Sequence, residues 1–257
     1  MITECDSNQA AAVFLVTGSD TGVGKTVFTG LLGRYLSDKG VCLRLAKPFC
    51  SGGRGDIDYL AACGALGQGE VNFWYDDEPI SPAAWELRTG DEVDFDGCVE
   101  WVFKVEGGRM KGEGEGGVLL VEGVGGLLAP LAKGRTVASL GQALGSPLIV
   151  VAPNRVGVVN QVLLTVEVAS GRGLSVACVV LMEQEETDLS AVDNAELIRM
   201  HLPEMADFKG VFEFPWLGEG ADDPGLIALN VKKADGVLGE IFEACVLPSL
   251  GRDASVD

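Results

Sequence analysis

Basic side chains and histidine are scarce in this chain of 257 residues. It has 19 lysines and arginines against 38 aspartates and glutamates, so its formal net charge at pH 7 is −19. Such a surplus of acid excludes a broad phosphate-neutralising surface, and we expect no binding to nucleic acid or to an anionic membrane. The single histidine, His201, stands just before Pro203 at an expected helix end, which argues against a histidine general base.

Cysteine pairs and long apolar runs are also missing. The seven cysteines are scattered and no C-x-x-C pair occurs, so neither a zinc site nor a thioredoxin-type motif is indicated. We expect free thiols in a reducing, cytoplasmic environment. The chain shows no signal peptide and no run of 18 apolar residues, which predicts a protein without a membrane span.

Glycine is abundant, and its 36 residues gather at the ends of apolar runs, where tight turns need them. A continuous apolar run predicts a strand covered on both faces at 11–17, and further apolar-rich segments predict strands at 41–47, 118–122, 147–152, 176–181 and 211–214. Amphipathic segments predict helices at 25–39, 136–144, 158–169, 189–201 and 234–245. The alternation predicts an α/β fold, a single-domain doubly wound, mostly parallel sheet flanked by helices.

The domain is placed at residues 10–246, with flexible termini at 1–9 and 247–257. The acidic segment 66–116 holds three of the four tryptophans and departs from the alternation. We interpret it as an extended connection with one helix near 97–110.

A phosphate-binding loop is predicted at Gly18-Ser-Asp-Thr-Gly-Val-Gly-Lys25-Thr26, between a strand and a helix. Its backbone N–H groups and the helix N-terminus attract anions. Lys25 would reach the β- and γ-phosphates, and the Thr26 hydroxyl would bind Mg²⁺. Five residues, instead of the usual four, separate Gly18 from Gly24. With this loop the fold is expected to be of the P-loop NTPase type; the alternative is a glycine-rich turn that carries Lys-Thr by chance.

Three charged motifs follow strands whose carboxyl ends should meet at one sheet edge. Lys47 could neutralise charge that moves between phosphates and an acceptor, or it could be a solvent-exposed lysine at the end of a strand. Asp56 and Asp58 could serve Mg²⁺ or begin a helix as cap and first-turn acid, and both interpretations stay open. Glu122 could be a Mg²⁺-associated acid at a strand tip, or part of an ordinary turn.

Two later turns are weaker candidates. Gly157-Val-Val-Asn160 opens an apolar helix and could bind an anionic group, or be an ordinary loop. Pro215-Trp216-Leu217 ends the last strand and could hold a purine ring, or pack on the core.

In this order the motifs resemble those of dethiobiotin synthetases, the ATP-dependent carboxylases that close the ureido ring in biotin synthesis. The resemblance covers about residues 13–220 and includes the unusual five-residue spacing of the loop. It also rests on Lys47-Pro-x-x-Ser51-Gly52, Ser81-Pro82, Val121-Glu122-Gly-x-Gly125-Gly126, and Gly157-x-x-Asn160 followed by Leu163-Leu164-Thr165.

The resemblance implies a homodimer that converts 7,8-diaminopelargonate, CO₂ and ATP to dethiobiotin, through a carbamate and a carbamic–phosphoric anhydride. The implied catalytic residues are Lys25 and Lys47, and the implied Mg²⁺ ligands are Thr26, Asp56 and Glu122. ATP would contact Gly22, Val23, Gly24, Lys25, Thr26, Val27, Pro215, Trp216 and Leu217. The substrate would contact Thr21, Ser51, Gly125, Gly157 and Asn160, the last two across the dimer interface.

Two positions depart from the family. Met182 stands where the family often has an Asn that recognises the nucleotide base, and Ala83 replaces the usual His after Ser-Pro. The nucleotide preference is therefore open.

Two other functions compete. A nucleotide-driven switch or partner-binding ATPase would usually carry a second Lys in the loop, where Asp20 and Thr21 stand. An amide-forming synthetase of the superfamily would need a glutaminase domain, for which 257 residues leave no room.

Overall fold

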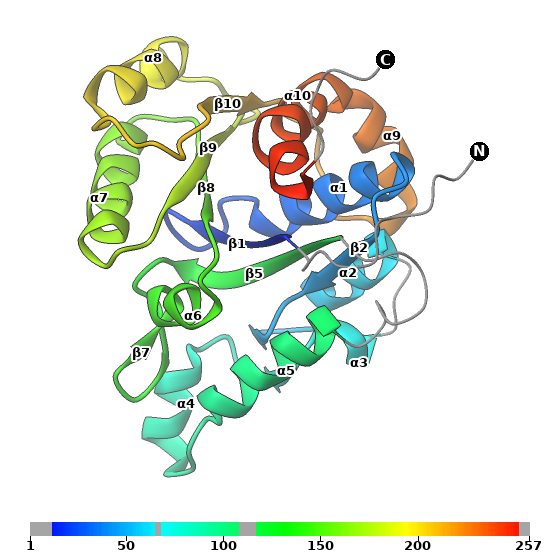
Figure 1. The fold of residues 1–257 in the computed structure, drawn as a ribbon, viewed down its shortest axis with the longest axis vertical. Coiled ribbons are helices and arrows are strands. Elements are labelled where there is room, and N and C mark those ends of the chain that lie inside the picture. Colours follow the sequence, from blue (N-terminus) through cyan, green and yellow to red (C-terminus); the bar gives the residue numbers. More distant parts are fainter. Residues whose placement is uncertain (1–11, 65–67, 108–116, 252–257) are drawn as a thin grey trace.

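The computed structural model describes residues 12–64, 68–107 and 117–251 (Figure 1). Its main sheet has six parallel strands in the order β10-β9-β8-β1-β5-β2. The strands are β1 (Ala12–Gly18), β2 (Leu43–Ala46), β5 (Val118–Gly126), β8 (Leu148–Pro153), β9 (Val176–Met182) and β10 (Val211–Phe214). This confirms the predicted doubly wound sheet. Strands that come later in the chain lie on both sides of β1, so the strand order reverses there. The carboxyl end of β1 therefore faces the crevice where such sheets bind ligands.

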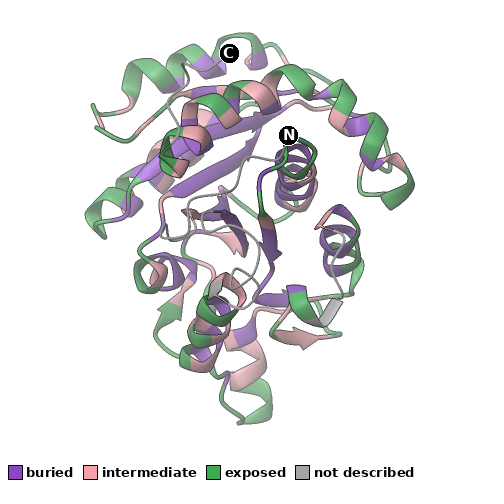
Figure 2. Cartoon of the chain, turned by 45° about the vertical axis from the view of Figure 1, so that its right-hand side comes forward, coloured by how far each residue is buried: buried purple, intermediate pink, exposed green. Residues whose placement is uncertain are grey.

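Helices cover both faces of this sheet (Figure 2), since successive strand residues alternate between two apolar clusters. One face packs against α1 (Lys25–Asp38), α2 (Gly55–Gly64), α9 (Ile227–Lys233) and α10 (Asp235–Ile241). The other packs against α5 (Phe95–Gly107), α6 (Val137–Leu144), α7 (Val158–Gly171) and α8 (Ala191–His201). Figure 1 shows α7 and α8 on the left of the sheet, with α1, α9 and α10 on the right.

The acidic segment is more structured than we predicted. Besides α5, it forms α3 (Gln68–Val71), β4 (Trp74–Asp76) and α4 (Pro82–Thr89), and β4 pairs with β3 (Phe49–Ser51). The prediction of an extended connection with one helix was therefore wrong. Helix α4 has clear end signals, because the Ser81 side chain accepts a hydrogen bond from Ala84 N and Gly90 ends the helix with a φ of 81°.

Smaller elements complete the chain. A hairpin of β6 (Pro130–Ala132) and β7 (Arg135–Thr136) follows β5. The predicted last helix is α10, followed by a π-helical turn at Phe242–Val246 and a 3₁₀ turn at Leu247–Leu250. Residues 247–250 are thus folded, contrary to the flexible terminus expected from 247; residues 1–9 and 252–257 lie outside the described ranges. Among the described residues, no helix combines the length and apolar character that crossing a bilayer requires.

Candidate active site

The predicted phosphate-binding loop joins β1 to α1 through glycines that other residue types could not replace without strain. Gly22 and Gly24 have φ values of 71° and 91°, in the left-handed region. A Cβ on Gly18 would lie 2.6 Å from the Asp20 carbonyl oxygen and 2.8 Å from Lys25 Nζ. Gly18 is therefore needed for close packing, which is a local reason for the unusual spacing.

Lys25 begins α1 and points back into the loop. Its Nζ donates to the Asp20 carbonyl oxygen at 2.9 Å, and the residue is buried. Burial lowers the pKa of Lys25 from 10.5 to about 8; the ammonium of Lys47 adds to this effect, and the carboxylate of Glu122 opposes it. A nucleotide phosphate would favour the charged ammonium.

An ion cluster joins three of the predicted residues, of which Lys47 and Glu122 are buried and Asp56 is half exposed. Lys47 Nζ lies 2.5 Å from Glu122 Oε1 and 2.7 Å from Asp56 Oδ2. Thr26 Oγ1 donates to the same Glu122 oxygen at 2.8 Å. The sheet register brings them together, because Lys47 follows β2, Glu122 lies in β5, and the two strands pair from Leu43–Val118 to Ala46–Val121.

The cluster shifts the pKa values of both ions of the Lys47–Asp56 pair. Burial lowers the pKa of Lys47, but the carboxylates of Glu122 and Asp56 outweigh it and raise the pKa above its usual range. Burial raises the pKa of Asp56, but the ammonium of Lys47 outweighs it and the net pKa is lowered. Both groups are therefore charged near neutral pH.

These side chains line a cavity of about 540 Å³. Twelve of the predicted residues meet there: Thr21, Gly22, Val23, Gly24, Lys25, Thr26, Val27, Lys47, Ser51, Asp56, Glu122 and Gly125. The lining includes Asp56 and not Asp58, which favours Asp56 as the acid of the site. It does not include Gly157, Asn160 or the segment 215–217, whose roles stay predictions.

Sequence reasoning assigned no role to one wall of the cavity. Pro79 and Ile80 form it together with Ser81 and Pro82 at the start of α4, and Asp222 also lines the cavity. A Cβ on Gly52 would lie 2.8 Å from Pro79 Cβ, so the turn after β3 packs closely on this wall. The start signals of α4 were present in the sequence, but no spacing tied Asp222 to the other motifs.

The expected base-binding region lies at the ends of β9 and β10, where Met182 pairs with Phe214. Met182 is buried, and a Cβ on Gly24 would lie 3.0 Å from its Cε. The side chain thus supports the phosphate-binding loop. Trp216 is 46% exposed and the carbonyl oxygen of Leu217 accepts from Lys233 Nζ at 2.7 Å.

The turn before α7 is fixed by a buried amide network. Asn154 Nδ2 donates to Glu183 Oε1 at 2.6 Å, and Asn194 Nδ2 donates to Asn154 Oδ1 at 2.9 Å. Gly157 caps α7 with a φ of 90°. Further along, α7 borders a smaller hollow of about 400 Å³ that also contacts the phosphate-binding loop, lined by Ser19, Asp20, Thr21, residues 125–129, Leu164, Thr165 and Val168.

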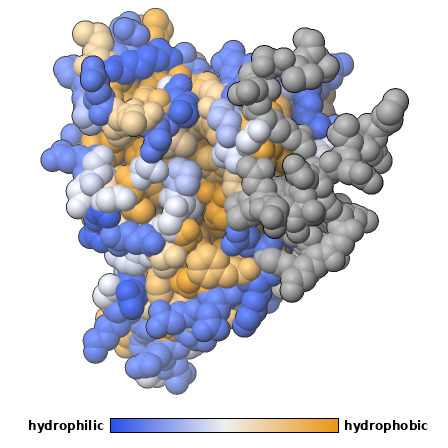
Figure 3. Space-filling model, in the orientation of Figure 1, coloured by the Kyte–Doolittle hydropathy of each residue, from blue (hydrophilic) through white to orange (hydrophobic). Residues whose placement is uncertain are grey.

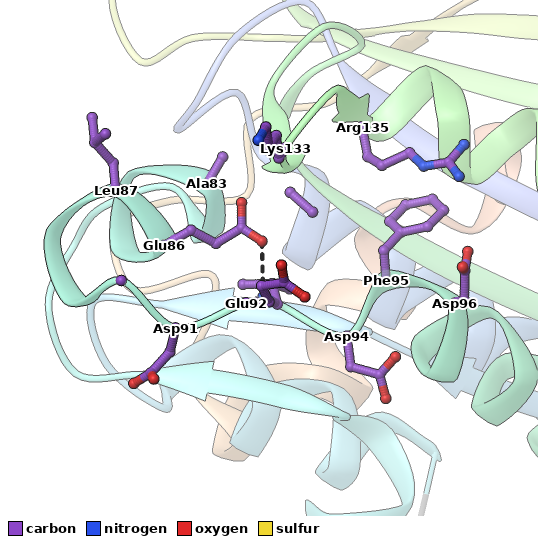
Figure 4. Close-up of a pocket in the computed structure, with 13 residues that line it drawn as sticks. Ala83, Glu86, Leu87, Asp91, Glu92, Asp94, Phe95, Asp96, Lys133 and Arg135 are labelled. Carbon is purple, nitrogen blue, oxygen red and sulfur yellow. Dashed lines mark hydrogen bonds between the residues drawn. The ribbon is translucent and has the colours of Figure 1, made fainter.

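A larger cavity, of about 1030 Å³, lies between α4, residues 90–96 and the β6–β7 hairpin (Figure 4). Its lining contains none of the predicted site residues. Glu86 Oε1 accepts from Val93 N at 2.8 Å, and the Arg135 guanidinium lies 5.2 Å from the centre of the Phe95 ring. These contacts stabilise its walls.

A magnesium ion fits the donor groups of the 540 Å³ cavity. Within the described ranges, no three His, Cys, Asp or Glu side chains form a metal cluster. Mg²⁺ commonly needs only one or two carboxylates, because phosphate oxygens and water complete its shell. Thr26, Asp56 and Glu122 offer a hydroxyl and two carboxylates, and the buried Glu122 Oε2 has no hydrogen-bond partner in the described part of the chain.

Comparison with known proteins identifies the family. A family model described as an AAA domain matches residues 12–219. The ATP-dependent dethiobiotin synthetase BioD of Anaeromyxobacter sp. is 37% identical over 197 residues, covering 72% of this chain and 83% of the relative. The enzyme of the same name from Methanococcus vannielii is 32% identical over 171 residues, covering 66% and 78%. That from Bacillus cereus is 32% identical over 193 residues, covering 72% and 77%.

Proposed function

We propose that this chain, which belongs to the dethiobiotin synthetase family, makes dethiobiotin from 7,8-diaminopelargonate, CO₂ and ATP. The observation that carries the proposal is the meeting of Lys25, Thr26, Lys47, Asp56 and Glu122 around one cavity beside a phosphate-binding loop. The relatives to which this chain is similar are named for ATP-dependent synthesis of this product. The activity is that of an ATP-dependent cyclo-ligase.

The chemistry proceeds in three steps. One substrate amine adds to CO₂ and loses a proton, giving a carbamate. A carbamate oxygen then attacks the γ-phosphorus of ATP, which breaks the bond to ADP and forms a carbamic–phosphoric anhydride. The second amine attacks the carbonyl carbon, loses a proton and expels phosphate as the ring closes. The amines are themselves the nucleophiles, so the reaction suits a chain with one histidine.

The chain's own residues orient the reactants and neutralise the charge on the phosphates. Backbone N–H groups of residues 22–27 and the N-terminus of α1 bind phosphate oxygens. Lys25 and Lys47 stabilise the charge on the transferring phosphoryl group. Thr26, Asp56 and Glu122 hold Mg²⁺, which neutralises phosphate charge when bound. The cavity also has to exclude water, because the anhydride hydrolyses readily.

Base recognition falls to the ends of β9 and β10. Met182 stands in place of the family's amide side chain and packs against Gly24. We assign contact with the base to Pro215, Trp216 and Leu217. Asp222 adds a carboxylate to the cavity wall, and a carboxylate suits a ribose hydroxyl.

We place Thr21, Ser51 and Gly125 at the substrate within one chain, and Gly157 and Asn160 at the substrate site of a partner in a homodimer. Apolar surface interrupts the polar surface in the middle of the face in Figure 3. Val156 is 75% exposed, Leu164 of α7 54% and Leu128 47%, which supports an interface beside α7. Light scattering during gel filtration tests the dimer.

We also place the enzyme in the cytoplasm. The six cysteines of the described ranges are free, as is usual in a reducing compartment.

The deciding experiment incubates the purified chain with ATP, bicarbonate and 7,8-diaminopelargonate, and measures dethiobiotin by mass spectrometry. Product that depends on all three, and that is lost in Lys25→Ala, supports the proposal. ATP hydrolysis that is independent of diaminopelargonate, without product, would instead indicate a nucleotide-driven switch.

A further inference from the structure

The ammonium of Lys47 stands between the two carboxylates that we assign to Mg²⁺. Its Nζ lies 2.5 Å from Glu122 Oε1 and 2.7 Å from Asp56 Oδ2. The Lys47 side chain is 4% exposed and that of Glu122 0%, so water cannot screen this pair. One cation is therefore already present where two carboxylates converge.

Each of the three proposed metal-binding side chains is engaged through one oxygen, and the buried Glu122 Oε2 is left without a partner in the described part of the chain. Glu122 Oε1 accepts from both Lys47 and Thr26, and the Thr26 hydroxyl is used as the donor. Asp56 Oδ2 pairs with Lys47. A divalent cation entering here would meet a positive charge a few ångströms away, and the two cations would repel each other, most strongly beside the buried Glu122 carboxylate.

A negative partner is needed to release the lysine. Without Lys47, the buried Glu122 carboxylate would lose its ion pair, which is unfavourable. Nucleotide phosphates bring negative charge into the same cavity, whose lining contains both Lys47 and the phosphate-binding loop. The phosphates can then pair with the Lys47 ammonium, while the metal ion pairs with Glu122 and Asp56.

We propose that Lys47 is a positioning residue that keeps divalent cations out of the nucleotide-free site, so that the metal enters only together with the nucleotide. This rests on the proposed metal and nucleotide site, and does not depend on the carboxylation chemistry. Lys25 has no such role, because its ammonium donates to the backbone carbonyl of Asp20 and not to a carboxylate.

The test titrates the nucleotide-free protein with Mn²⁺, a paramagnetic substitute for Mg²⁺, and follows free Mn²⁺ by electron paramagnetic resonance. The wild type should show no saturable site below about 1 mM, and a nonhydrolysable ATP analogue should create one. Lys47→Gln should bind Mn²⁺ at least about tenfold more tightly without nucleotide, because a nearby positive charge has gone. Lys47→Arg should behave like the wild type.

Lys25→Gln is the matched control, since it removes the same charge from the same cavity. It should raise Mn²⁺ affinity clearly less than Lys47→Gln does, because the Lys25 ammonium donates to the Asp20 carbonyl oxygen and does not stand between the two carboxylates. An equal gain in Lys25→Gln would overturn the proposal, because the effect would then be one of general charge. Adding Glu122→Gln to Lys47→Gln should abolish the gain; a gain that persists would place the metal elsewhere and also overturn it.

The wild type provides a test that needs no variant. Mg²⁺ alone should leave its melting temperature unchanged, whereas Mg²⁺ with the ATP analogue should raise it. Stabilisation by Mg²⁺ alone, equal to that with the analogue, refutes the role of Lys47. Failure to form dethiobiotin with the expected Mn²⁺ pattern refutes the proposed reaction and leaves the role of Lys47 standing.

Discussion

Replacing Gly18 by alanine should damage both folding and nucleotide binding. The added Cβ would lie 2.6 Å from the Asp20 carbonyl oxygen, 2.8 Å from Lys25 Nζ and 3.0 Å from the Gly125 carbonyl oxygen. Two of these neighbours are backbone atoms, on the loop itself and on the end of β5, so neither can move aside by a side-chain rotation.

The expected loss follows from these contacts. Overpacking of this kind destabilises proteins by about 1–3 kcal/mol. For a domain of this size each kcal/mol lowers the melting temperature by roughly 2–4 °C. Displacing Lys25 Nζ also disturbs its contact with phosphate, and a hydrogen bond to a charged group contributes about 1.5–3 kcal/mol, which corresponds to roughly 10- to 100-fold in affinity.

Urea unfolding measures the loss of stability, and calorimetric titration with a nonhydrolysable ATP analogue measures the loss of nucleotide affinity. Gly236→Ala is the matched control, because Gly236 lies in α10 and a Cβ added there would have no atom within 4 Å. That variant should keep its nucleotide affinity and gain up to about 1 kcal/mol from helix propensity. If Gly18→Ala binds nucleotide within twofold of the wild type and unfolds at the same urea concentration, the packing explanation of the loop spacing is wrong.

Three further predictions concern the charged residues of the cavity. Lys25→Met should stabilise the nucleotide-free protein at pH 7, because burial lowers the pKa of Lys25 to about 8 and so disfavours its charged form in the folded state. Between about pH 8 and 10.5 the unfolded wild type holds a proton on Lys25 that the folded wild type has lost, so the wild type gains stability and the advantage of Lys25→Met should shrink. Urea unfolding at pH 7 and pH 10 checks this. Lys47→Ala should lower the free energy of unfolding by about 3–5 kcal/mol, because it leaves the buried Glu122 carboxylate without its ion pair; a loss below 1 kcal/mol in urea unfolding contradicts this. Asp56→Asn should weaken Mn²⁺ binding in the presence of the ATP analogue by about 10- to 100-fold, while Asp58→Asn should change it less than threefold, because of these two residues only Asp56 lines the cavity. A larger loss in Asp58→Asn than in Asp56→Asn would mean that Asp58 is the metal-binding residue.

The sequence was sufficient for the phosphate-binding loop and for the main sheet. Both depend on local patterns: a strand such as 176–182 is a continuous apolar run, and the loop carries glycines followed by Lys25-Thr26. Parallel strands then place their carboxyl ends at one edge, so Lys47 and Glu122 could be expected near the loop. The same reasoning failed for α3 and α4, because helices of four and eight residues are too short for their periodicity to stand out in an acidic segment.

Only the tertiary structure decided which charged groups meet. Lys47 and Glu122 are 75 positions apart, and their contact depends on the pairing of β2 with β5. The choice of Asp56 over Asp58 depends on how α2 packs beside that pair. Asp222 reaches the cavity from a turn near the end of the chain, with no spacing rule to signal it. Residue type and local pattern specify the chemistry available to this protein, whereas distances between remote segments come from packing, which no local pattern encodes.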